Sequence, residues 1–205
     1  IRLSLVGSEM CIRDRWLLNR DNTTLKLLLY DGVKVLYVLF ITALIIALLF
    51  FRKTALLKPY RNGLLIVLLS TVLVPLTVGY FKSITNIPCP RDLAMYDGSY
   101  PYVTLLSSYP ESFHQEHSVQ SYPAGHASGG FAMMSLFFLF RQNRNRVIGL
   151  VACFVTGWVT GGYKMLIGDH FLSHTVTTMF VAGLIILILA RLLQSADMRQ
   201  PYLSG

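Results

Sequence analysis

Residues 33–51, VKVLYVLFITALIIALLFF, decide the class of fold. Lys34 is the only charged residue in this stretch, and it lies near one end. A helix needs about 20 predominantly apolar residues to cross the hydrocarbon core of a bilayer. A lysine near the end of such a helix can extend its amine to the membrane surface. The stretch therefore predicts a membrane-spanning helix.

Further apolar stretches follow, at residues 63–81, 127–140, 147–163 and 175–193. Membrane helices tolerate a proline such as Pro75. The stretch at 127–140 is short, and residues 122–125 can extend it toward the membrane surface. A soluble helical bundle would show apolar stripes, whereas these runs are continuous. The sequence predicts an all-α, multi-pass transmembrane helix bundle with five visible spans.

Composition agrees with a membrane protein, because 54% of the residues are hydrophobic and only 14% are charged. Soluble domains carry about 25% charged residues. A net charge of +8 in a soluble protein would suggest nucleic acid. Here the basic residues lie at the ends of apolar runs, which indicates membrane topology and no nucleic-acid partner. The three widely spaced cysteines show neither a disulfide framework nor the ligand spacing of a zinc site.

The first residues, 1–15, lack the basic, apolar and small-residue regions of a signal peptide. We interpret them as an artefact or a disordered tail outside the fold. Residues 16–32 are then an outward segment, residues 33–199 are the membrane domain, and residues 200–205 are a second tail.

Basic residues fall on alternate connections between the spans. They are Arg52, Lys53, Lys58 and Arg61, then Arg141, Arg144 and Arg146, and finally Arg191 and Arg199. The positive-inside rule places these connections in the cytoplasm. The connections at 82–125 and 163–174 then face outward. Because five spans would start outside, we expect one preceding helix and six spans in the complete protein.

The outward connections carry ionisable residues at membrane level, which indicate function by default. The first holds Lys82 and Arg91 and ends in YPAGHASGG, residues 122–130, with Gly125 and His126. The second holds Lys164, Asp169, His170 and His174. Histidines within a set of cations suit an anionic phosphoryl group.

Each piece also has a plainer interpretation. A lone lysine at a helix end is usually a membrane-surface anchor. A lone Gly-His is usually a turn, and the glycines at 125–130 also suit close helix packing. The set as a whole favours a site, because all its members share one face at particular spacings.

These spacings resemble the three-part pattern of the type 2 phosphatidic acid phosphatase superfamily. Bacterial members with Cys-Pro-x-Asp-Leu and His-Phe-Leu-Ser-His stretches look most similar. Lys82 and Arg91 match the first part, Pro123-Ala124-Gly125-His126 the second, and Lys164, His170 and His174 the third. This chain departs from the pattern by two extra residues between Lys82 and Arg91 and by five replacements. These are Asp92 for Pro, Ala124 for Ser, Tyr163 for Ser, Lys164 for Arg and His174 for Asp.

The resemblance implies a mechanism that needs no metal and no other cofactor. It makes His170 the nucleophile that forms a phosphohistidine, and His126 the general acid. Lys82, Arg91, Lys164 and the backbone at Gly125 would bind the phosphate oxygens. His174 would orient His170 as a hydrogen-bond acceptor, and Asp92 or Asp97 is the alternative for that role.

The implied substrate is a membrane lipid phosphate or diphosphate, hydrolysed at the outer face of a bacterial inner membrane. Phosphatidic acid, phosphatidylglycerol phosphate, undecaprenyl diphosphate and lipid A phosphate are candidates. Tyrosines within residues 96–117 suit the membrane surface, and His114, Glu116 and His117 are interpreted as a solvated loop. The alternatives are a lipid phosphotransferase, a non-catalytic relative that binds anionic lipids, and a vanadate-dependent haloperoxidase. The sequence does not predict an oligomeric state.

Overall fold

The computed structural model describes residues 11–12, 15–51, 54, 57–105, 107–115 and 117–199. Most of the two expected tails lies outside these residues, as do Arg52, Lys53 and Glu116. Cys11–Ile12 (β1) and Arg15–Trp16 (β2) form a two-stranded antiparallel pair, so part of the expected tail at 1–15 is described as strand.

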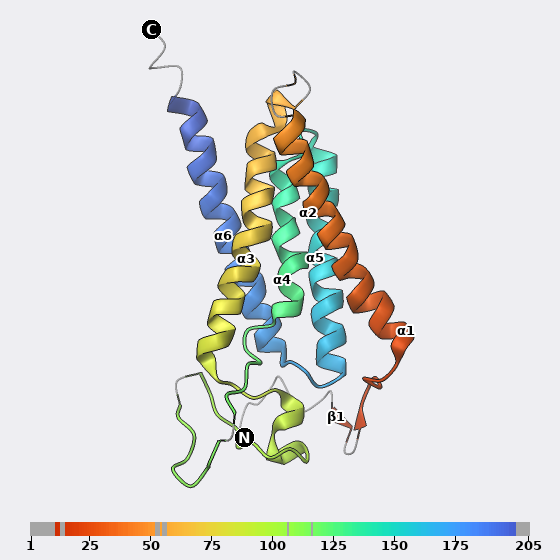
Figure 1. Ribbon diagram of the computed structural model, residues 1–205, viewed down its shortest axis with the longest axis vertical. Helices are drawn as coiled ribbons and strands as arrows, with labels where there is room; N and C mark the ends of the chain where they lie inside the picture. The colour runs from red at the N-terminus through yellow and green to blue at the C-terminus, as the bar shows by residue number, and fades with distance from the viewer. Residues whose placement is uncertain are drawn as a thin grey trace.

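The other regular elements of the described chain are all helices, which confirms the predicted multi-pass bundle (Figure 1). The long helices are Gly32–Phe51 (α2), Arg61–Thr85 (α3), Asn143–Leu166 (α5) and Leu172–Arg199 (α6). The short ones are Thr23–Lys26 (α1), Leu27–Asp31 (η1, a π-helix), Lys58–Tyr60 (η2), Pro90–Asp92 (η3), Ala94–Tyr96 (η4), Gly125–Ala132 (α4) and Met133–Phe138 (η5). Four helical segments of the described chain are long and apolar enough to cross a membrane. They are Thr23–Phe50, Lys58–Asp92, Asn143–Leu166 and Leu172–Leu193.

The predicted span at 127–140 has a different form. It is the short helix α4 followed by the 3-10 helix η5, and it runs through the middle of the bundle (Figure 1). Its small residues allow this placement, because a Cβ on Gly130 would lie 2.6 Å from the backbone of Gly157 in α5. Small residues let membrane helices approach closely, so Gly130 serves helix packing.

Apolar side chains lie both inside and outside the bundle. Val74 and Val78 of α3 pack with Phe131 of α4 and Ala182 of α6 in one buried cluster. Leu36 of α2 and Leu187 of α6 are among many apolar side chains that are exposed. Helices that are apolar on their outer surfaces suit a lipid environment.

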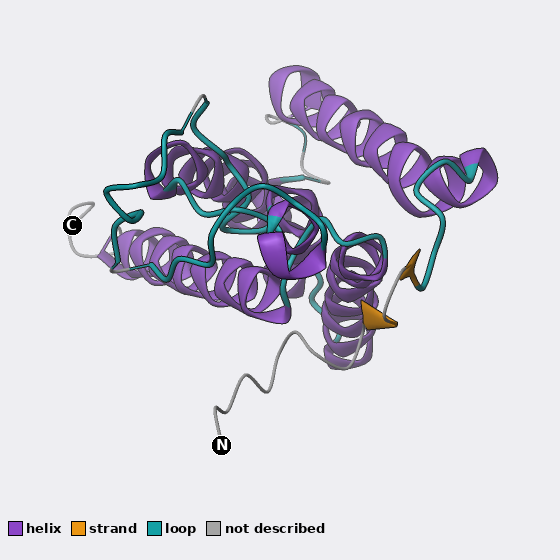
Figure 2. Cartoon of the chain, turned by 90° about the horizontal axis from the view of Figure 1, so that it is seen from below, coloured by secondary structure: helices purple, strands orange, loops and turns teal. Residues whose placement is uncertain are grey.

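The helix α2 stands apart from the other long helices at its lower end (Figures 1 and 2). Farther along α2, Leu44 packs with Leu64 and Val67 of α3. The hydroxyl of Tyr37 donates a hydrogen bond of 2.8 Å to the Thr71 carbonyl. Helix α2 is therefore joined to the bundle through its contacts with α3.

The connection between α3 and α4 covers the lower end of the bundle (Figure 1). Asn86 ends α3 in a left-handed conformation with φ 45°. Its Oδ1 accepts hydrogen bonds from Gln115 Nε2 at 2.8 Å and from the Val119 N–H at 2.9 Å. The Tyr109 hydroxyl donates to the Asn86 carbonyl at 3.0 Å. One asparagine thus holds the distant parts of this connection together.

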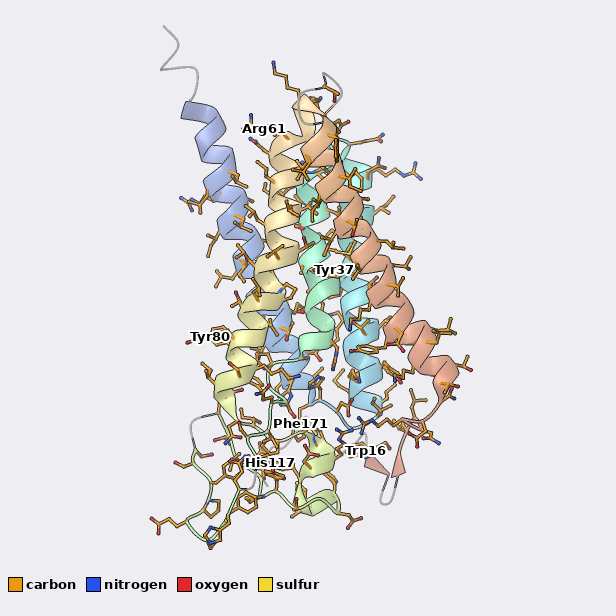
Figure 3. All side chains as sticks on the ribbon, in the orientation of Figure 1. Trp16, Tyr37, Arg61, Tyr80, His117 and Phe171 are labelled. Atoms are coloured by element: carbon orange, nitrogen blue, oxygen red, sulfur yellow. The ribbon has the colours of Figure 1, made fainter. Side chains whose placement is uncertain are left out.

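The two ends of the bundle differ in character. Figure 3 labels Arg61 at the upper end, and Trp16, His117 and Phe171 at the lower end. The covered lower end also receives the turn between α5 and α6, which holds His170 (Figure 1).

Candidate active site

Three helix ends bring the three predicted histidines together. His126 is the second residue of α4, His170 lies in the turn between α5 and α6, and His174 lies in the first turn of α6. The ring centroids of His126 and His170 are 5.6 Å apart, and those of His170 and His174 are also 5.6 Å apart. The rings form a chain with His170 in the middle.

His170 and His174 face each other through Nδ1 atoms 3.4 Å apart. Their exposed fractions are only 4% and 2%. His174 also hydrogen-bonds the backbone of Ser121. Because the Ser121 N–H already donates to the Ile87 carbonyl at 3.2 Å, the Ser121 carbonyl is left as the acceptor.

This arrangement favours one placement of the ring protons. Donation of Nε2–H from His174 to the Ser121 carbonyl would leave its Nδ1 with a lone pair that accepts Nδ1–H of His170. The Nε2 of His170 is then unprotonated. It is buried and has no hydrogen-bond partner among the described residues.

The pKa of His170 lies well below its ordinary value of 6.5. Burial is the main cause, because it disfavours the charged ring. The nearby rings of His174 and His126 and the amines of Lys82 and Lys164 act in the same direction. His170 is therefore neutral near pH 7, which a nitrogen nucleophile requires.

Two of the three predicted cations meet at one carboxylate. Arg91 Nη1 lies 2.8 Å from Asp169 Oδ1, and Lys164 Nζ lies 2.8 Å from Asp169 Oδ2. The Arg91 contact is a close ion pair without the alignment of a hydrogen bond. The sequence placed Asp169 in the second outward connection but did not predict this role.

The local backbone explains how Asp169 reaches Lys164. Gly168 adopts φ 80°, a conformation that favours glycine, directly after α5. The Asp169 N–H donates to the Lys164 carbonyl at 2.8 Å. The Arg91 N–H donates to the Gly168 carbonyl at 3.2 Å, which joins η3 to the same turn.

Lys82 and Gly125 complete the set of predicted phosphate-binding groups. Lys82 lies in the last turn of α3 and is within electrostatic range of Lys164 and Asp169. Gly125 begins α4, and Ala124 provides no side-chain cap for the helix. The first N–H groups of a helix lack partners within it and attract anions.

The alternative partners for His170 lie elsewhere. Asp92 accepts a hydrogen bond of 2.7 Å from the Cys89 thiol, and its other oxygen lies 3.6 Å from Arg91 Nε. Asp97 is exposed, in a left-handed conformation at the end of η4. The group that faces Nδ1 of His170 is His174.

An apolar cavity of about 640 Å³ adjoins His126. It lies between η1 and α2 on one side and α4 and α5 on the other, and its lining includes Val33, Leu36, Gly125, His126, Met133 and Thr160. Tyr30 also lines it, with its ring edge-on to His126 at 4.9 Å between centroids. Lys164 Nζ lies 4.8 Å from the Tyr30 ring. No pattern in the sequence points to Tyr30, because its contacts come from distant helices.

Within the described part of the chain, no three His, Cys, Asp or Glu side chains form a group that could hold a metal ion. The ionisable groups that do gather are the histidine chain and the Arg91–Asp169–Lys164 cluster. Such a combination is suited to binding and reacting with a phosphoryl group.

The fold and the site together define a multi-pass membrane protein with a histidine and cation cluster at one end of its bundle. A family model described as the PAP2 superfamily matches residues 63–197. The chain belongs to this superfamily, whose members are phosphatases, and the predicted resemblance is confirmed. Comparison with curated proteins and with solved structures finds no match. The matched residues include every predicted site residue, while Tyr30 lies before them.

Proposed function

We propose that the protein hydrolyses a membrane lipid phosphate or diphosphate through a phosphohistidine on His170, without a metal ion. The observation that carries this proposal is the environment of His170. Its Nδ1 faces His174 at 3.4 Å, and its buried Nε2 has no partner among the described residues. A neutral imidazole held in this way is suited to nucleophilic attack.

In the first step, the lone pair on His170 Nε2 attacks phosphorus. The bond from phosphorus to the lipid oxygen breaks, and His126 gives its proton to that oxygen. In the empty site burial, Lys164 and Lys82 lower the pKa of His126 to about 4, and the negative charge of a bound phosphate raises this pKa so that the ring can carry the proton. Lys82, Arg91 and Lys164 stabilise the charge on the phosphoryl oxygens. His174 accepts the Nδ1–H of His170 throughout the step.

In the second step, neutral His126 takes a proton from water as the water oxygen attacks phosphorus. The bond between phosphorus and His170 Nε2 breaks, which releases orthophosphate. His170 is neutral again and His126 is protonated, so the site is ready for another substrate.

The apolar cavity supports a lipid as the substrate. Its lining residues come from helices at membrane level, and it reaches His126. Ligand sites are typically apolar cavities with a few polar groups that orient the ligand. A hydrocarbon chain in this cavity would place its phosphate near the histidines. The candidate substrates remain those that the resemblance implies.

The basic residues support a site on the outer face of a bacterial inner membrane. Arg61 lies at the end of the bundle opposite His117 and the site (Figure 3). By the positive-inside rule, the Arg61 end is cytoplasmic. Hydrolysis of an impermeant lipid phosphate by intact spheroplasts would support this orientation. Hydrolysis only after lysis would contradict it.

The purified full chain in lipid nanodiscs tests the reaction. We expect release of orthophosphate from phosphatidic acid in the presence of chelator and without an added acceptor. His170→Ala should lower kcat by about 100-fold or more, since both steps need its Nε2. The matched control is His117→Ala in the outer connection, which should retain activity. Activity in His170→Ala, or its loss in chelator, would contradict the proposal.

A further inference from the structure

We propose that the carboxylate of Asp169 substitutes for phosphate in the empty site and so sets the affinity of that site for phosphate. This inference rests on the proposed role of Arg91 and Lys164 in binding the phosphate group. Both carboxylate oxygens are engaged, one with each cation, at 2.8 Å. The substrate phosphate must then compete with a carboxylate that the protein supplies.

The cluster is largely shielded from water. The exposed fractions of the Asp169 and Lys164 side chains are 11% and 12%, and that of Arg91 is 32%. Two cations that are close together and shielded are costly to leave unpaired. Asp169 removes this cost when no substrate is present.

A purely structural role for the carboxylate is the plainer interpretation. Backbone hydrogen bonds already join the same segments, since the Arg91 N–H donates to the Gly168 carbonyl. The Asp169 N–H itself donates to the Lys164 carbonyl. The polar contacts of the Asp169 oxygens within the described residues are with the two cations alone. The turn therefore has its own support, and the carboxylate serves the cations.

The balance of charge points to the same role. Lys82, Arg91 and Lys164 contribute three positive charges, and Asp169 offsets one of them through direct contact with two of the cations. Asp92, 3.6 Å from Arg91 Nε, offsets part of the rest. A phosphate monoester carries between about −1.5 and −2 near neutral pH. Without Asp169 the site would carry one more positive charge and hold the anion more tightly.

This offset favours turnover, because the product orthophosphate is also an anion. As orthophosphate leaves, Asp169 remains as the partner of Arg91 and Lys164. Asp169 stabilises the empty site, and it lowers the free energy needed to release the product by the same amount. Asp169 is accordingly a residue that tunes affinity, and it takes no part in bond making or breaking.

Asp169→Asn tests the inference because it removes the charge and nearly preserves the shape. With orthophosphate as the probe, we expect the dissociation constant to fall roughly tenfold. We also expect a lower melting temperature without orthophosphate and a larger rise when orthophosphate is added. Thermal unfolding and competitive inhibition measure these effects in the full chain in nanodiscs.

Two further variants are the controls. Asp97→Asn removes an exposed carboxylate near the same end of the bundle and should leave the orthophosphate affinity within about twofold of the wild type. Asp169→Glu keeps the charge and should also stay within about twofold. If Asp169→Asn fails to fold, the orthophosphate affinity of Asp169→Glu still tests the inference.

The outcomes separate this inference from the proposed reaction. Unchanged or weaker orthophosphate binding in Asp169→Asn would overturn it. The inference would also be overturned if Asp97→Asn or Asp169→Glu bound orthophosphate as much more tightly as Asp169→Asn does. A wild-type protein that binds no orthophosphate would overturn it as well. Binding that follows the expected order in a chain without hydrolysis would support this inference and refute the proposed reaction.

Discussion

His170 and His174 lie four residues apart in the chain and meet through their Nδ1 atoms. The resemblance predicts an aspartate where His174 stands. A neutral imidazole can accept the same hydrogen bond, but it brings no negative charge. The His170 imidazolium therefore has little stabilisation, and burial keeps the pKa of His170 well below 6.5.

The first prediction concerns the dependence of kcat/KM on pH. The reaction needs neutral His170, so the acid limb of the profile follows the lowered pKa of this residue, while the need for a proton on His126 limits the rate as pH rises. We expect the wild type to keep activity below pH 6.5, the ordinary pKa of histidine. His174→Asp should move the acid limb to higher pH, because a carboxylate stabilises the His170 imidazolium. Both pH profiles are measured on the same substrate, so protonation of the substrate phosphate affects the two proteins equally and does not produce a difference between them.

Coincident acid limbs in the two proteins would contradict this prediction. On the acid side, the free energy of unfolding depends on pH in the same direction as the activity. The neutral ring of His170 contributes fully to the free energy of unfolding above its pKa in the unfolded chain, about 6.5. This contribution is lost as pH falls toward the lower pKa of the folded protein. Acid should therefore unfold the wild type in part by protonating this ring.

At the scale of elements, α4 carries His126 and depends on contact with α5. A Cβ on Gly130 would lie 2.6 Å from the Gly157 backbone, where there is no flexible side chain to move aside. Gly183 in α6 has nothing within 4 Å of the corresponding position. These two glycines provide a matched pair for testing the contact.

The second prediction is that Gly130→Ala destabilises the protein by about 1–3 kcal/mol, the usual cost of overpacking. It should also lower kcat, because α4 would shift and take His126 with it. Gly183→Ala should leave stability unchanged or slightly higher, since alanine favours helix. Thermal unfolding in one detergent measures both variants. Equal stability of the two would show that α4 and α5 are not tightly packed at Gly130.

At the scale of the whole molecule, the separation of α2 from the bundle accompanies the apolar cavity beside His126. Gly129 lines this cavity, and a Cβ there would lie 3.4 Å from the Tyr37 ring. A large side chain at this position would fill space that the proposed function assigns to a lipid chain. Gly79, an exposed glycine of α3, has nothing within 4 Å of its Cβ position and is the matched control.

The third prediction is that Gly129→Leu raises KM for a long-chain lipid phosphate by about tenfold or more. Each buried methylene contributes about 0.8 kcal/mol, so losing two or more gives this effect. KM for a water-soluble phosphate ester without a long chain should change little. Gly79→Leu should affect neither substrate. Equal losses on both substrates in Gly129→Leu would place the lipid chain elsewhere.

The sequence by itself determined the membrane class and the all-helical fold. Bilayer thickness imposes a length on apolar runs, so hydropathy identifies the long spans without tertiary information. The expected span at 127–140 came out as α4 followed by η5. Its form depends on packing in the middle of the bundle, which hydropathy does not report.

Motif spacing also indicated the three histidines and three cations, because residues at adjoining helix ends share one end of the bundle. Only the tertiary structure decided that Asp169 faces Arg91 and Lys164 and that Tyr30 lies against His126. Those contacts join segments far apart in the chain. Helical periodicity relates neighbours three and four residues apart, while contacts between distant segments depend on how the helices pack.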